Sequence, residues 1–162
     1  MDDFFSKLES YDIFNSFLPG IVIVTYAKYA IPLHLDLNSI EEIALALFLG
    51  VVINRLGSLI IEPIYIKLHL IKKVGYTFFV KAEKQDPKIK ILLALCNMYR
   101  SLVAMVITTI LYDGIRLAQG NNCIVNLAIE LLLLIIFTFS YKKQWGYIVK
   151  RIEFATKEDI VN

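Results

Sequence analysis

Three long apolar stretches most constrain what this chain can fold into. They cover approximately residues 43–61, 91–112 and 123–141, and each is close to the roughly 20 residues with which an α-helix crosses a bilayer. Of the 162 residues, 57% are hydrophobic, which is more than a soluble domain needs, because such a domain must also present a polar surface. The sequence therefore predicts an all-α, polytopic membrane protein.

A fourth apolar stretch lies near the start of the chain, at approximately residues 13–35. The residues before it are acidic, and no cleavage site of small residues follows it, so we expect it to remain as a helix instead of being removed as a signal peptide. Four transmembrane helices use nearly all of the chain. We expect a single membrane domain over residues 1–162, with a loop at 64–90 and a tail at 142–162.

Lysines and arginines are unevenly distributed between the connections. The loop at 64–90 and the tail at 142–162 are rich in lysine, whereas the connections 36–42 and 113–122 hold one cation, Arg116. Because cytoplasmic loops of membrane proteins carry an excess of Lys and Arg, both basic segments are predicted to face the cytoplasm. With four spans, the N- and C-termini are then cytoplasmic as well.

Hydrophilic side chains interrupt three of the apolar stretches. They are Asn54, Arg55, Asn97, Arg100 and Glu130. Such groups are costly in hydrocarbon and usually face a bundle interior or a water-filled cavity. Two interpretations stay open: an ion-pair network that joins Arg55 or Arg100 to Glu130 within one protomer, or a pore or gate in a homo-oligomer.

Further features of the second span bear on the pore hypothesis. Glu62 follows Arg55 by seven residues, which on a regular α-helix places both on one face and adds Glu62 to the candidate pore or gate residues. We expect the helix to stop at Glu62-Pro63 and to resume after it, with Pro63 as a hinge. Gly50, Gly57 and Ser58 form a small-residue strip, which marks either the oligomer axis or the tightest helix crossing.

The basic residues next to the membrane have two possible roles. The candidates for ligand binding are Lys72, Lys73, Lys142, Lys143, Lys150 and Arg151. Attraction to anionic lipid headgroups would explain most of them. Multiplied by subunit number and interleaved with aromatic residues, they could instead hold a nucleotide or single-stranded DNA, as sequence-tolerant single-strand binders do.

The sequence does not predict an enzyme. The two histidines, His34 and His69, are expected on opposite membrane faces, and the chain contains no hydrolase, zinc-protease or nucleotide-binding motif. Cys96 and Cys123 have no CxxC or Cys/His cluster beside them. We therefore expect no catalytic residues, no metal site and no cofactor.

Several short strings together resemble a family of small bacterial membrane proteins that are encoded beside antiphage defence genes. They are Leu18-Pro19-Gly20, Asn54-Arg55-Leu56-Gly57-Ser58, Ile61-Glu62-Pro63, Asp86-Pro87-Lys88 and Asn97-Met98-Tyr99-Arg100. Within this group the chain is most similar to the channel effectors of the Hailong system, and next to the membrane subunits of the Kiwa system.

The first resemblance implies a homotetrameric ion channel in the bacterial inner membrane. Single-stranded DNA oligomers from a partner nucleotidyltransferase would hold it shut, and its opening during infection would depolarise the cell in an abortive response. The second implies a non-conducting sensor or scaffold that recruits a cytosolic DNA-binding partner. A toxin-like membrane disruptor without a ligand is a third possibility.

Overall fold

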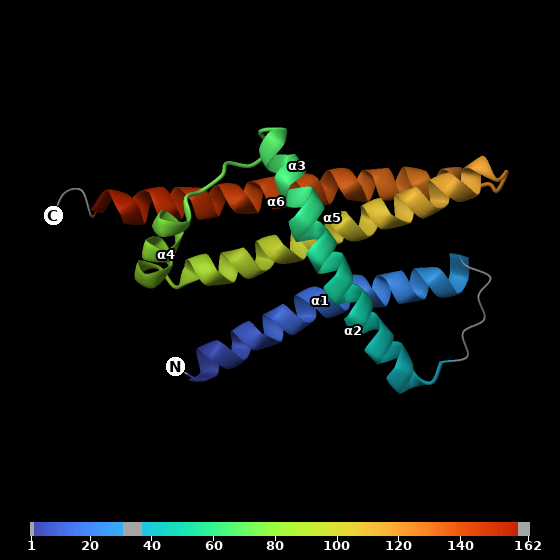
Figure 1. Ribbon diagram of the computed structural model, residues 1–162, viewed down its shortest axis with the longest axis horizontal. Coiled ribbons are helices and arrows are strands. Elements are labelled where there is room, and N and C mark those ends of the chain that lie inside the picture. The colour runs from blue at the N-terminus through green and yellow to red at the C-terminus, as the bar shows by residue number, and fades with distance from the viewer. Residues whose placement is uncertain (1, 31–36, 159–162) are drawn as a thin grey trace.

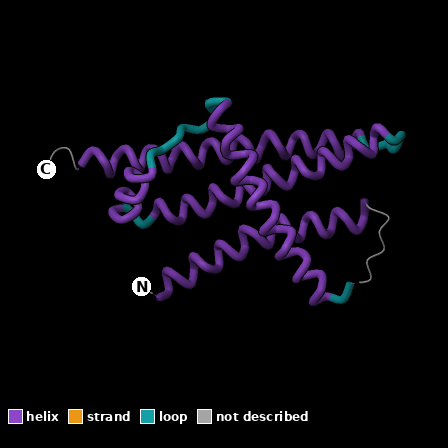
Figure 2. Tube along the Cα trace, in the orientation of Figure 1, coloured by secondary structure: helices purple, strands orange, loops and turns teal. Residues whose placement is uncertain are grey.

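The computed structural model describes residues 2–30 and 37–158, and within this part of the chain every regular element is helical (Figures 1 and 2). The elements are α1 (Asp2–Ala30), α2 (Ser39–Leu56), a π-helical segment η1 (Gly57–Ile61), α3 (Glu62–Lys67), α4 (Tyr76–Gln85), α5 (Lys88–Ala118) and α6 (Ile124–Glu158). The all-α class expected from the sequence is confirmed.

Three helical stretches are long and apolar enough to cross a membrane: Ser39–Lys67, Lys88–Ala118 and Ile124–Thr156. In α1 the apolar part of the described helix is the shorter segment Phe17–Ala30. The end of the first expected span, including His34, falls within residues 31–36 and lies outside the described residues. A membrane protein with three such helices is therefore supported, and the fourth span stays a prediction.

The helices extend beyond the expected spans. The expected stop at Glu62-Pro63 is wrong, because α2, η1 and α3 form one continuous helical stretch that ends at Lys67. Most of the expected tail is also helical, as α6 has 35 residues. At 1.5 Å per residue it is about 52 Å long, so it exceeds a hydrocarbon layer of about 30 Å. Its last turns must then protrude on one side.

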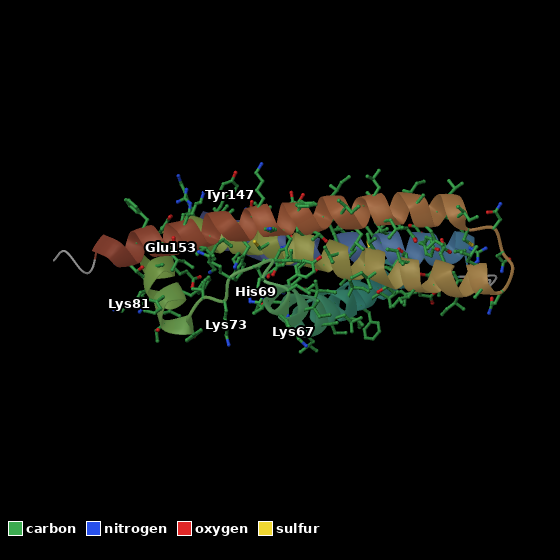
Figure 3. The ribbon with its side chains drawn as sticks, turned by 90° about the horizontal axis from the view of Figure 1, so that it is seen from above. Lys67, His69, Lys73, Lys81, Tyr147 and Glu153 are labelled. Atoms are coloured by element: carbon green, nitrogen blue, oxygen red, sulfur yellow. The ribbon has the colours of Figure 1, made fainter. Side chains whose placement is uncertain are left out.

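Helices α1, α5 and α6 run along the long axis of the molecule, and the stretch from α2 to α3 crosses them obliquely (Figure 1). Figure 3 shows α2 on one side of the molecule and α6 on the opposite side, with α1 and α5 between them. The N-terminal end of α1, helix α4 and the C-terminal end of α6 lie at the same end of the molecule (Figure 1). This arrangement fits the expectation that all basic segments share one side.

Small residues allow α2 to approach its neighbours closely. A Cβ atom added at Gly20 of α1 would lie 1.8 Å from the backbone oxygen of Ala46, and one added at Gly57 would lie 3.2 Å from the backbone oxygen of Arg100. Gly50 is also buried on this inward face. The small-residue strip therefore marks a tight crossing within the protomer, as one of its two interpretations expected.

Local signals set the helix boundaries at the basic end. The carboxylate of Asp86 accepts a hydrogen bond from the backbone N–H of Lys88 at 3.0 Å, and α5 begins there. Helix α3 ends through His69, which has a φ of 57°, while the N–H of Leu70 bonds back to the carbonyl of Tyr65 at 2.9 Å. Such a left-handed residue is a common way to close a helix.

Candidate functional site

A polar cluster lies where α2 and α3 cross α5, and we call it the Arg100 cluster. The guanidinium of Arg100 forms an ion pair with the carboxylate of Glu62. One helical position further on, the hydroxyl of Ser101 lies 3.1 Å from the side-chain oxygen of Asn54 and donates a 2.9 Å hydrogen bond to the backbone carbonyl of Asn97. Four of the six candidate pore or gate residues thus lie at this crossing, in two adjacent sets of contacts, and Asn97 takes part through its backbone carbonyl.

The Arg100 cluster is largely removed from solvent. The side chain of Arg100 is 13% exposed and that of Glu62 is 30% exposed. The fully buried ring of Tyr141 from α6 packs beside them. Because an arginine placed in an apolar layer needs a counter-charge, this pair fixes the position of α3 against α5. Its first role is therefore structural, within one protomer.

The π-helical segment η1 explains why Glu62 reaches Arg100. In η1 the backbone N–H of Glu62 bonds to the carbonyl of Gly57, five residues earlier. One extra residue in that turn rotates the following side chains by about 100° relative to a regular α-helix. Pro63, which has no N–H, follows directly. The expectation that Arg55 and Glu62 share one face assumed regular geometry and is corrected here.

Arg55 lies on the outward face of α2, and its side chain has no ion pair or hydrogen bond with any residue in the described part of the chain. It is next to Asn54, whose contact with Ser101 sets it at the same level along the bundle as the Arg100 cluster. Large apolar side chains surround it on this face, namely Phe48, Val51, Val52, Leu56 and Leu59. We call this the Arg55 face.

Glu130 does not join either arginine, contrary to the ion-pair network considered from the sequence. It lines a pocket between α1, α5 and α6, near the end of the bundle opposite α4, together with Tyr26, Thr109, Arg116 and Asn126. We call it the Glu130 pocket. The hydroxyl of Thr109 lies against the carboxyl group of Glu130. The hydrophilic side chains therefore form two separate groups along the bundle.

A second buried carboxylate lies behind the Glu130 pocket. Asp113 of α5 is 0% exposed, and its Oδ1 atom is 3.5 Å from the guanidinium of Arg116. The hydroxyl of Tyr26 faces the carboxylate of Asp113. Neither group has any other hydrogen-bond partner among the described residues. The guanidinium of Arg116 also stacks over the ring of Tyr112 at 5.9 Å.

Sequence reasoning missed Asp113, because the expected span ended at residue 112 and placed it in an exposed connection. A usable signal was present. Thr109, Asp113 and Arg116 follow one another at spacings of four and three, which places them on one face of a helix. The helix that carries them continues to Ala118.

The basic residues of the candidate ligand site do not form one patch in the protomer. Arg151 forms an ion pair with Asp86, and the ammonium group of Lys72 is 3.9 Å from the carboxylate of Glu153. Figure 3 shows Lys73 on the side of the molecule opposite Tyr147. Trp145 is turned inward, and its ring N–H donates to the backbone carbonyl of Lys72 at 2.8 Å.

One linear group of basic and aromatic side chains remains on the outer surface of α6. Its members are exposed and follow at spacings of four, three and four, which keeps them on one face: Lys143, Tyr147, Lys150 and Phe154. We call this the α6 stripe. It lies beyond the apolar centre of α6, in the part that protrudes toward the end occupied by α4 (Figure 1).

Comparison of the chain with protein-family models, with curated proteins and with solved structures finds no match.

Proposed function

We propose that this protein is a homo-oligomeric ion channel in which the Arg55 faces of neighbouring subunits meet around the ion path. The observation that carries the proposal is the guanidinium of Arg55, which has no partner among the described residues and lies near the middle of a 29-residue apolar helical stretch. A charged side chain at that depth costs about 2.5–3.5 kcal/mol on insertion scales, and more in simulations of isolated helices. Water or another subunit beside Arg55 removes this cost.

The described side chains of the protomer are closely packed at this level. Six consecutive residues of α5, 101–106, are buried, and Ile53 and Tyr141 are buried beside them. Packed side chains of this kind leave few voids larger than a water molecule. In this proposal the path for ions therefore lies between protomers, which fits a ring of α2 helices. A ring of arginines would attract anions.

The regulatory part of the proposal rests on the resemblance to antiphage membrane effectors and on the α6 stripe. In this proposal a nucleotide or single-stranded DNA oligomer binds the α6 stripe and the neighbouring lysines through backbone charge and base stacking. The ligand then biases η1 and Pro63, which connect the basic end to Arg55. Opening during phage infection would depolarise the inner membrane of the cell.

The alternative is a non-conducting sensor or scaffold that recruits a cytosolic DNA-binding partner. The α6 stripe favours it as much as it favours ligand gating, because protruding basic and aromatic side chains suit either a polyanion or an acidic protein surface. The two functions differ in ion flux and in the recruitment of a cytosolic partner.

Ion flux from reconstituted protein separates these functions. Proteoliposomes would be loaded with a chloride-sensitive or potassium-sensitive dye and tested with and without short single-stranded DNA. We expect flux from the native protein, altered flux from Arg55→Ala, and native flux from Lys67→Ala, which removes an exposed cation from the end of the same helical stretch. Lys143→Glu with Lys150→Glu should change only the response to DNA.

The outcomes are distinct. Absence of flux from correctly folded oligomers under every condition would overturn the channel proposal, and capture of a cytosolic partner by the same protein would then favour the scaffold. Flux that neither DNA nor the α6 variants change would overturn ligand gating while leaving conduction intact.

A further inference from the structure

The Glu130 pocket is a cavity of about 390 Å³ between the ends of α1, α5 and α6. Most of its wall is apolar, and its polar groups come from all three helices, with Tyr26 on α1, Thr109 and Arg116 on α5, and Asn126 and Glu130 on α6. A volume of this size admits an ion together with several water molecules. A few convergent polar groups in an apolar cavity are typical of a binding site.

The carboxylate of Glu130 is incompletely satisfied by the protein. The residue is 8% exposed, and its Oε2 atom has no hydrogen-bond partner among the described residues. Burial of an ionised oxygen without a partner costs several kcal/mol in typical proteins, so such atoms are rarely left alone. Because Glu130 lines the cavity, an ionised Glu130 would take its missing partner from what the cavity contains.

The surrounding charges define what that partner is. Asp113 is fully buried behind the pocket, and Arg116 lies 3.5 Å from its carboxylate and supplies one positive charge. Arg116 is thus engaged by Asp113, and an ionised Glu130 would leave one negative charge without a counter-charge. The pocket therefore fits a species with a single positive charge. A divalent ion would make the net charge of the occupied pocket positive.

We propose that the Glu130 pocket binds one monovalent metal cation, Na⁺ or K⁺. Glu130 supplies the charged oxygen, and the hydroxyls of Tyr26 and Thr109 and the side-chain oxygen of Asn126 supply neutral ones, with water completing the shell. Hard cations prefer such oxygen ligands. A bound cation would tie α1 to α5 and α6. This inference does not depend on conduction through the Arg55 face.

The test is cation-dependent stability of the full-length protein in detergent at neutral pH. Thermal unfolding would be followed at constant ionic strength in NaCl, KCl or choline chloride, and after addition of CaCl₂. At ten times the dissociation constant, we expect Na⁺ or K⁺ to raise the unfolding temperature of the native protein by about 3–6 °C over choline. The rise should vanish in Glu130→Gln and persist in Glu153→Gln, which makes the same change at an exposed position of α6.

A second variant keeps the test decisive if Glu130→Gln does not fold. Thr109→Val removes one neutral ligand at nearly constant volume and should raise the cation concentration for half-maximal stabilisation by roughly three- to tenfold. Equal unfolding temperatures in NaCl, KCl and choline chloride would overturn the proposal. So would stabilisation by Ca²⁺ alone, or stabilisation on acidification without any cation effect, which would assign the charge to a bound proton.

Discussion

The two mid-bundle arginines differ in how their charge is satisfied. Arg100 on α5 points into the crossing with α3, is 13% exposed and is paired with Glu62. Arg55 on α2 lies at the same level, faces outward among apolar side chains, and has no pair in the described part of the chain. One arginine is therefore explained by the protomer alone, whereas the other has no partner among the described residues, and the channel proposal rests on it.

This difference arises from the five residues of η1. Without the π-helical turn, Glu62 would return to the face of Arg55, and the two could neutralise each other on the surface of α2. Because of the rotation, Glu62 forms its ion pair with Arg100 instead, and Arg55 stays exposed. Segments of this kind are rare and are frequently found at functional sites. We expect the two arginines to be separate in role as well as in structure.

The largest effect on stability is expected at the Arg100 pair. Glu62→Ala leaves a mostly buried guanidinium without its counter-charge and should lower the free energy of unfolding by about 2–4 kcal/mol. Chemical unfolding in mixed micelles measures it. The double variant Glu62→Leu with Arg100→Leu should recover part of this loss, because no charge remains buried. A direct pair would be contradicted if the loss of unfolding free energy in the double variant equalled the sum of the losses from the two single substitutions.

Arg55→Glu should change conduction and leave the fold intact. A ring of carboxylates in place of guanidinium groups should shift the permeability ratio toward cations by about tenfold, as a change of about 1–2 kcal/mol in an aqueous path would produce. Reversal potentials of single channels under a KCl gradient measure this ratio. An unchanged ratio with native unfolding behaviour would remove Arg55 from the ion path.

Pro63→Ala tests the segment that separates the two arginines. Alanine restores an N–H that can bond four residues back, which favours α-helical over π-helical geometry in η1 and turns Glu62 away from Arg100. We expect the free energy of unfolding to change by about 1 kcal/mol. The response of ion flux to DNA should also change clearly. Ile64→Ala, at the next exposed position, should leave that response unaltered.

The smallest effect is expected at the partly exposed ion pair of Asp86 with Arg151. Burial opposes ionisation of Asp86, yet the hydrogen bond and charge of Arg151 and the N–H of Lys88 hold its pKa below the ordinary value of 3.8. Its contribution is therefore complete above that value and is lost as pH falls below about 4. Asp86→Asn should lower the free energy of unfolding by up to about 1 kcal/mol at neutral pH. It should also flatten the acid limb, the low-pH part of a plot of unfolding temperature against pH. An acid limb of unchanged slope would show that Asp86 gains nothing from the pair.

The sequence predicted the helical class and three long apolar helices, because these depend on local composition. It also selected four of the residues in the Arg100 cluster. It did not pair them correctly. The pairing of Arg100 with Glu62 requires η1. Tertiary contacts stabilise this π-helical turn, and no local sequence pattern predicts it.

The Glu130 pocket shows a second limit of sequence reasoning. Asp113 was counted with the connection after the third span, since hydropathy declines there, while the structure continues α5 to Ala118 and buries the carboxylate completely. The contact between α1 and α5, through the Tyr112 hydroxyl and the carbonyl of Ala30 at 3.0 Å, depends on which helices are neighbours. That information is not contained in the periodicity of either helix.

The central claim is that the Arg55 face borders water or another subunit and not acyl chains. It is tested most directly by the reaction of Arg55→Cys in proteoliposomes with a charged, membrane-impermeant thiol reagent. The two native cysteines, Cys96 and Cys123, are buried and should react slowly. We predict fast reaction at position 55 with a simultaneous change in flux. Reaction only with a lipid-soluble maleimide, and with flux unchanged, would contradict the account.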